Sequence, residues 1–230
     1  MNDLIDAKRL PPRQILADGV YDTIKGLLMD QSITPESRIN IDKLARELQV
    51  SPTPVREALA RLESEGLVTK EALRGYSAAP LLTRSSFIQL FELRLLLEPV
   101  IARKAAALLT EEDLLTLEQL VREMREVQVG QSYQEYQQLA VADAAFHDVL
   151  ARACGNVFFH DILERLHPHL HLYRLYFHTG IVTETIAEHR EILNALRQRD
   201  AEAAASAMAR HLEQAHLRLP PEPGKKLPQT

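Results

Sequence analysis

The chain has 230 residues, 46% of them hydrophobic, and a formal net charge of −5, which leaves room for one large domain or two modest ones. It contains no apolar run long enough to span a bilayer, and its start lacks the basic and apolar segments of a signal peptide. The single cysteine, Cys154, excludes an intramolecular disulfide and is typical of a reducing compartment. We therefore expect a cytoplasmic protein with no membrane partner.

The acidic balance argues against a protein that binds nucleic acid through charge alone. Even residues 1–80 carry eleven basic and twelve acidic side chains, a net charge of −1. Any attraction to phosphate must therefore come from a local group of cations. The candidates are Arg46, Arg56, Arg61, Lys70 and Arg74.

Residues 1–13 include Pro11-Pro12 and show no periodic pattern, so we expect a flexible arm there. A domain is expected to follow over residues 14–80. Between Gln14 and about Asp30, apolar residues at helical spacing predict an amphipathic helix. Residues 39–41 can then form a short strand.

Residues 41–66 predict two short helices joined by a tight turn. The first helix has one apolar face, formed by Leu44, Ala45 and Leu48. Gln49-Val50 make the bend, and Ser51 can cap the next helix with its side-chain oxygen. Pro52 and Pro54 fall in the first turn of that helix, where backbone N–H groups have no intrahelical partner.

The second of these helices has two different faces. Its inward face is formed by Val55, Ala58, Leu59 and Leu62. Its outward face is formed by Thr53, Arg56, Glu57, Ala60 and Arg61. A short helix with one buried face and an arginine on the other suits the major groove of DNA, as in a helix-turn-helix. The same spacing also fits a small helical core unit that binds nothing.

A β-hairpin is expected next. Leu67 to Glu71 alternates like a strand, residues 72–75 turn, and Tyr76 to Ala79 runs back. Arg74-Gly75 lies at the tip, where glycine permits the bend and a close approach to a DNA backbone. An ordinary surface hairpin would show the same pattern.

Two segments extend the match beyond spacing: Ser51 to Leu59, SPTPVREAL, and Arg61 to Val68, RLESEGLV. They resemble the winged helix-turn-helix of the GntR family of bacterial regulators. The resemblance implies a homodimer that binds double-stranded, near-palindromic operator DNA and regulates transcription, which we expect to be repression. The DNA-binding residues that it implies are Ser51, Thr53, Arg56, Arg74 and Gly75.

The sequence departs from that family in two places. Pro52 stands where many relatives carry arginine, and Asp42 stands where the fatty-acid-responsive members have a basic contact residue. The operator sequence therefore does not carry over from relatives, and Thr53, Arg56 and the hairpin tip bear more of the DNA contact.

Beyond Pro80 the pattern is almost entirely helical, so residues 83–218 predict an all-helical antiparallel bundle. We expect six helices, at about 83–109, 110–129, 133–154, 156–178, 183–197 and 200–217. Residues 219–230 are proline-rich and are expected to form a disordered tail. The whole chain is thus predicted to be mainly α, with two domains.

One carboxylate and three imidazoles in this half can ligate a metal ion. Asp143 and His147 are four residues apart on one predicted helix and so project from one face. His189 and His211 lie in two later helices beside apolar core positions, where an imidazole needs a partner. Such a set suits zinc, nickel or manganese better than calcium or magnesium. Spacing alone favours the plainer interpretation, a solvated acid and ordinary histidines.

Three segments around these residues change that balance: DAAFH, which ends at His147, then Glu188-His189-Arg190, and the stretch from Asp200 to His211. They resemble the metal-ligand segments of the FCD domain, the all-helical effector domain of the FadR-type branch of the GntR family. The resemblance implies a divalent ion held by Asp143, His147, His189 and His211, with a small carboxylate effector bound there. Six expected helices are more similar to the VanR-type subgroup than to the seven-helix FadR type.

Arg94, in the segment FELRLLLE, matches an arginine that the family uses in its effector pocket. A guanidinium can form bidentate, charge-assisted hydrogen bonds with a carboxylate, so Arg94 is an effector-binding candidate. A salt bridge with Glu98, one helical turn further on, is an equal alternative. His167, His169 and His171 alternate along a predicted bent helix, and we assign them no ligand role.

Three functions follow from these patterns. The leading one is a ligand-responsive transcription regulator that senses a small organic acid at a metal-centred pocket, and not an enzyme. The second is a metal-dependent hydrolase, which would need a general base beyond the ligands, and the sequence offers none evidently placed. The third is an ion that only stabilises the helical bundle.

Overall fold

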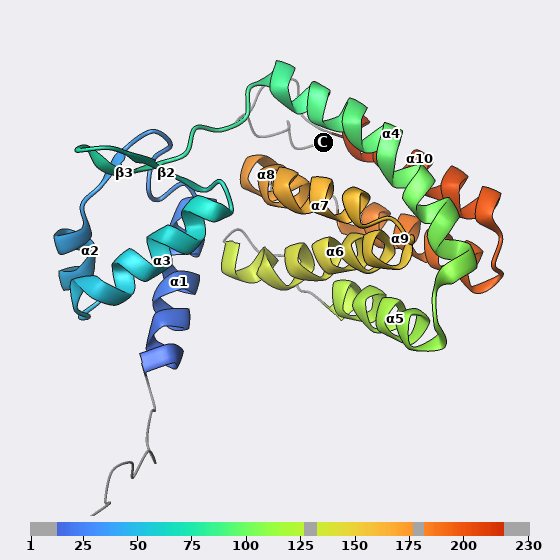
Figure 1. The fold of residues 1–230 in the computed structure, drawn as a ribbon, viewed down its shortest axis with the longest axis horizontal. Coiled ribbons are helices and arrows are strands. Elements are labelled where there is room, and N and C mark those ends of the chain that lie inside the picture. The colour runs from blue at the N-terminus through green and yellow to red at the C-terminus, as the bar shows by residue number, and fades with distance from the viewer. Residues whose placement is uncertain (1–12, 127–132, 177–181, 219–230) are drawn as a thin grey trace, which may run out of the picture. The chain divides into compact units, whose positions relative to one another are not determined.

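The computed structural model describes residues 13–126, 133–176 and 182–218 (Figure 1). The chain divides into two compact units, Met1–Pro80 and Leu81–Thr230. No helix in the described ranges is both long and apolar enough to cross a membrane. The expected arm, apart from Arg13, and the expected tail lie outside the described residues.

The first unit is a three-helix assembly with a small antiparallel sheet, as the sequence predicted. Its elements are α1 (Arg13–Met29), β1 (Arg38–Ile39), α2 (Ile41–Glu47), α3 (Pro52–Ser64), β2 (Val68–Glu71) and β3 (Gly75–Ala78). The strand order is β1-β3-β2, and β2 pairs with β3 from Val68↔Ala78 to Glu71↔Gly75. This arrangement is a winged helix-turn-helix.

The core of the first unit forms where α1 packs against α3. Ile24 and Leu28 of α1 are fully buried, as are Val55, Leu59 and Leu62 of α3. Spacings of four and three residues place the α3 side chains on one face, and the burial of that face against α1 supplies the stability that a short helix lacks by itself. The predicted inward face of α3 is confirmed.

The strand expected at 39–41 is shorter, because it ends at Ile39. The side chain of Asn40 accepts a hydrogen bond from the backbone N–H of Lys43 at 2.9 Å, so Asn40 is the N-cap of α2. Asparagine is among the best N-cap residues, and the helix therefore begins at Ile41.

The second unit is all-helical in its described residues. Its helices are α4 (Arg84–Leu108), α5 (Glu111–Glu126), α6 (Tyr133–Ala153), α7 (Val157–Leu166), α8 (Pro168–Tyr176), α9 (Val182–Arg197) and α10 (Ala201–Leu217). Capping side chains fix several starts. Thr83 accepts from the Ser86 N–H at 3.1 Å, and Asp200 accepts from the Ala203 N–H at 2.9 Å. The predicted caps of α4 and α10 are therefore confirmed.

Residues 156–178 were expected to form one bent helix, and this prediction was wrong. His167 has a left-handed φ of 42°, which ends α7, and Pro168 starts α8. Proline disfavours helical backbone at the residue before it and is well placed at the first position of a helix. The described part of the second unit thus has seven helices where six were expected, so the helix count from which the VanR-type subgroup was predicted is wrong.

Helix α10 packs along both α4 and α9, while α5 packs on α6 and α9. Both helices of this α4–α10 pair have buried alanines, including Ala102 and Ala105 on α4 and Ala204 and Ala205 on α10. Small side chains let the helix axes come close together. Because α4, α6, α9 and α10 surround one interior, polar residues on their inward faces meet there.

Candidate metal centre and DNA-reading face

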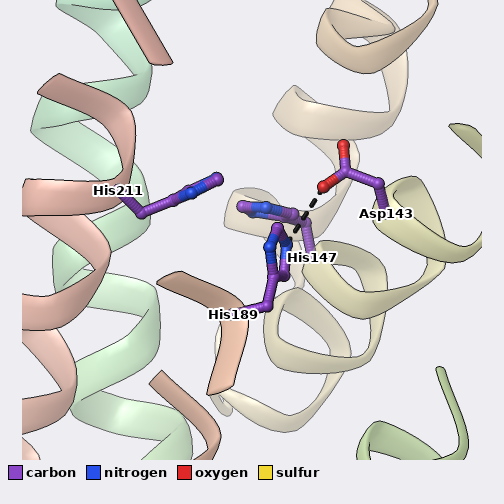
Figure 2. Close-up of side chains that lie close together, drawn as sticks. All are labelled: Asp143, His147, His189 and His211. Atoms are coloured by element: carbon purple, nitrogen blue, oxygen red, sulfur yellow. Dashed lines mark ion pairs between the residues drawn. The ribbon is translucent and has the colours of Figure 1, made fainter. Parts of the chain in front are cut away.

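The four predicted ligand residues come together inside the second unit (Figure 2). Asp143 and His147 lie one turn apart on α6, while α9 provides His189 and α10 provides His211. Each offers one ligand atom, and these atoms all lie within 4.8 Å of one another. All four residues are buried. We refer to this group as the His/Asp cluster.

The three imidazoles of the cluster are held by hydrogen bonds at Nδ1. His189 Nδ1 lies 2.8 Å from the carbonyl oxygen of Thr185, which can only accept. His211 Nδ1 donates to the carboxylate of Glu188 at 2.8 Å, and His147 Nδ1 donates to the carboxylate of Glu98. In a neutral imidazole with the proton on Nδ1, the lone pair is on Nε2. This is how protein metal sites orient their histidine ligands.

Several of the atoms that face one another in the cluster lack hydrogen-bond partners. They are Asp143 Oδ1, His147 Nε2 and His189 Nε2, each buried in the structure. His189 Nε2 lies 3.0 Å from Asp143 Oδ1, but the pair does not have the geometry of a hydrogen bond. Buried polar atoms are costly when unsatisfied. A cation bound between them would satisfy all three, so the donor set fits a divalent transition metal.

The charge states of the cluster also suit a cation. Burial acts to raise the pKa of Asp143, but the imidazoles of His169, His189 and His147 outweigh it and hold that pKa well below its usual range. Burial lowers the pKa of His211 to about 4, so this ring is neutral at physiological pH. An ionised carboxylate beside a neutral imidazole is the state that binds a metal ion.

A second carboxylate links the cluster to the end of α10. Glu188 accepts from His211 and also from both terminal nitrogens of Arg218, the C-cap residue of α10. Burial acts to raise the pKa of Glu188, yet the hydrogen bonds from Arg218 and His211 lower it to about 2. In the sequence, Glu188 stands out only as a neighbour of His189. Its role as the acceptor for His211 depends on packing between α9 and α10.

Arg94 forms the salt bridge that the sequence left as an alternative. Its guanidinium bonds the carboxylate of Glu98, and both side chains are almost fully buried. The same Glu98 accepts from His147. Burial acts to raise the pKa of Glu98, but its interactions with Arg94 and His147 outweigh burial and hold that pKa well below the usual range. Arg94 is therefore connected to the cluster through Glu98.

His169 is a residue of this site that the sequence analysis did not assign. Its Nε2 lies 3.1 Å from Arg94 Nη2 and 3.7 Å from Asp143 Oδ2, and its ring lies 4.5 Å from that of His147. The start of α8 at Pro168 turns His169 inward. Helical spacing placed only His167 and His171 on a shared face, so no sequence pattern pointed to His169.

In the first unit, the outward face of α3 is exposed as predicted. Ser51, Thr53 and Arg56 all lie on the surface at or near the start of the helix. Ser51 is the N-cap residue, but its side chain makes no capping hydrogen bond, contrary to our expectation. A capping side chain bonds the second or third helical N–H, and the third residue here is Pro54, which has none.

Arg61 was expected in the basic group of the first unit that attracts phosphate. Its side chain is instead paired with residues of α1. Its guanidinium lies 2.7 Å from Asp18 and 3.9 Å above the ring of Tyr21. The hydrogen bond with Asp18 raises the pKa of Arg61. Glu65 contacts Tyr21 and also bonds Lys25 at 2.8 Å, which ties the end of α3 to α1 a second time. Arg56 remains as an exposed cation at the candidate DNA positions, and Arg74 is also exposed but lies 3.2 Å from the carboxylate of Glu71.

Comparisons with known proteins agree with this architecture. The model of the gntR family of bacterial regulatory proteins matches residues 16–76, and the model of the FCD domain matches residues 89–214, more than half of the chain. The Uxu operon transcriptional regulator of Escherichia coli K12 is 31% identical, over 85% of this chain and 83% of the relative. The HTH-type transcriptional repressor RspR of the same strain is 26% identical, over 90% of each chain.

A solved structure shares the fold. McbR/YncC of E. coli superposes with a TM-score of 0.65 at 23% identity, over 86% of this chain and 94% of that one. The winged helix-turn-helix and the helical bundle therefore occur together in a known protein.

Proposed function

Because the chain belongs to the GntR family of bacterial regulatory proteins, in the branch with an FCD domain, we propose that it is a cytoplasmic repressor that responds to a small organic acid. Its domains and relatives are those of transcription regulators and not of enzymes. As a homodimer it would bind a near-palindromic operator, with one α3 at each half-site. The relative that is named a repressor supports the direction of regulation.

The DNA-binding part of the proposal rests on the outward face of α3 and on the hairpin. Ser51, Thr53 and Arg56 are exposed at the positive end of the helix dipole, and Arg74 and Gly75 are exposed at the hairpin tip. We assign Arg56 and Arg74 to phosphate or base contacts, because an exposed guanidinium suits both. Ser51 and Thr53 then contribute hydroxyl groups to the DNA backbone.

The sensing part rests on one observation, the convergence of unsatisfied buried ligand atoms in the His/Asp cluster. We propose that Asp143, His147, His189 and His211 hold zinc, nickel or manganese. An ion bound by these four residues would act as a Lewis acid, and an ion that takes more than four ligands, as nickel and manganese do, would also accept an oxygen atom of a small carboxylate. The buried setting strengthens that attraction, because it is poorly screened by water.

Arg94 is the proposed second contact for the effector. Its positive charge is already balanced by Glu98, so it would add a directed hydrogen bond and little net charge. His169 lies between Arg94 and Asp143 and would face the same ligand. A carboxylate of small size fits this setting better than a large apolar ligand, because the groups that surround it are charged or polar.

Replacing Arg56 with alanine tests the DNA-binding part. The duplex for this test is selected from a random pool by the full-length protein, and its affinity is measured by band shift over a range of salt concentrations. Arg56→Ala should weaken binding strongly, and the loss of one phosphate contact should lower the salt slope by about 0.9. Melting temperature and dimer content should not change, because Arg56 is exposed.

The matched control is Arg61→Ala on the same helix. This change removes the contacts with Asp18 and Tyr21 and should lower the melting temperature by a few degrees, since such exposed contacts contribute roughly 0.5–1 kcal/mol. The salt slope of DNA binding should stay as in the wild type. If Arg56→Ala bound DNA with unchanged affinity and slope, Arg56 would be excluded as a contact.

A further inference from the structure

The tip of the β2–β3 hairpin contains a leucine in an unfavourable backbone conformation. The backbone N–H of Arg74 donates to the carbonyl of Glu71 at 3.2 Å, which closes a four-residue turn. Leu73 is the third residue of this turn and has a left-handed φ of 65°. Turns with a positive φ at that position favour glycine or asparagine, because a branched apolar side chain is crowded there.

Packing of the Leu73 side chain does not offset this unfavourable backbone conformation. This side chain is fully exposed, and among residues 17–80 it is the one large apolar side chain that is. The turn would form more easily with asparagine or glycine, and a polar residue would be better solvated. Strain that the fold does not need is a feature of functional positions. Leu73 is therefore a candidate for contact with a partner.

The neighbours of Leu73 indicate what that partner is. Arg74 has a side chain that is 82% exposed and forms an exposed ion pair with Glu71 at 3.2 Å, and Lys70 is exposed on the adjoining strand. Lys70, Glu71 and Arg74 give the tip a net positive charge beside its apolar residue, which suits the minor groove of DNA with phosphates on both walls. Proteins that use this groove insert arginine into it and wedge leucine, isoleucine or phenylalanine between base steps.

We propose that Leu73 enters the minor groove of the operator and acts as an apolar wedge at a flexible base step. This inference rests on the proposed function as a DNA-binding regulator. Arg74 then lies on the phosphate backbone beside the wedge. Pyrimidine–purine steps unstack most easily, so they are the expected sites of contact. Leu73 would thereby add sequence preference at a position where no hydrogen bond to a base is made.

Substitutions at Leu73 should separate DNA binding from stability. Leu73→Asn places a residue that tolerates a left-handed φ in the turn, so its melting temperature should equal or exceed that of the wild type. Binding to the selected duplex should nevertheless weaken on the order of tenfold, as the apolar contact is lost. Leu73→Ala should weaken binding similarly. Neither variant should change the salt slope, whereas Arg74→Ala should lower it by about 0.9.

A base analogue tests the wedge directly. 2-Aminopurine is placed at the step that footprinting assigns to the hairpin, and its fluorescence should rise when the wild type binds and unstacks it. The rise should be absent with Leu73→Asn and present with Leu115→Ala, a control that removes an exposed leucine of α5. Unchanged affinity of both Leu73 variants, or unchanged fluorescence with the wild type, would overturn the wedge alone. Failure of the wild type to select any duplex would overturn the proposed function as well.

Discussion

Among single residues, Glu188 has the most specific task near the His/Asp cluster. Its carboxylate accepts from Nδ1 of His211 and is itself held by the guanidinium of Arg218. The orientation of the His211 ring therefore depends on Glu188, which is not one of the four proposed ligands. Groups in this position fix the tautomer and direction of a histidine ligand and raise its basicity.

Glu188→Ala should lower the affinity for a divalent transition metal by about 10- to 100-fold. The physical reason is that the His211 ring loses the acceptor that holds its Nδ1–H, so its Nε2 is no longer directed at the cluster. Affinity is measured by competition with a chromophoric chelator. The matched control is Glu191→Ala on the same helix, an exposed residue paired with Arg210 at 3.3 Å. Equal affinities in the two variants would show that Glu188 has no positioning role.

The ends of helices determine where the ligand-bearing segments lie. Helix α6 ends at Ala153, and Gly155 follows with a left-handed φ of 72°. A Cβ atom added at Gly155 would lie 2.9 Å from Cδ1 of Leu108, which is the far end of a flexible side chain. The main cost of a side chain at Gly155 is therefore the backbone conformation. Gly19, inside α1, has an ordinary helical backbone and open space around its Cα.

These two glycines should respond in opposite directions to alanine. Gly155→Ala should destabilise the protein by about 1–2 kcal/mol, because alanine is strained at a left-handed φ. Gly19→Ala should stabilise it by about 0.5–1 kcal/mol, because glycine inside a helix has the higher conformational entropy cost. Urea unfolding of each variant measures both values. Stabilisation by Gly155→Ala would contradict the helix end that the structure assigns.

In the whole molecule, the DNA-reading face and the His/Asp cluster belong to different compact units. A bound effector can change operator affinity only if its binding free energy differs between the DNA-bound and free states of the protein. The metal ion has a separate effect, because any ligand that binds only the folded state stabilises that state.

Removal of the metal should therefore have two measurable consequences. Metal at about 100 times its dissociation constant should stabilise the protein by about 2.7 kcal/mol, so chelation should lower the melting temperature. Small organic acids should change operator affinity in the metal-loaded protein and have no effect after chelation. Thermal shift and band shift measure the two effects on the same samples. If the acids acted equally on both forms, the ion would have only a structural role.

Much of the fold was open to prediction because its causes are local. Several elements are defined by residues that lie within or next to them. Examples are the apolar spacing of α3, the caps at Thr83 and Asp200 and the glycine after α6. The break at His167 was missed because a proline after a helix permits either a bend or a new start. Packing decided between the two.

The four cluster residues were also named from the sequence, through spacing on α6 and a longer resemblance. The sequence by itself therefore determined the identity of the elements and of the residues that can bind DNA or a metal ion. Only the tertiary structure decided how residues far apart in the sequence are paired: Arg61 with Asp18, Glu98 with His147, and Glu188 with His211. Such pairs join segments up to dozens of residues apart. Helical period and capping extend over only a turn or two, so they carry no information about which distant side chains will meet.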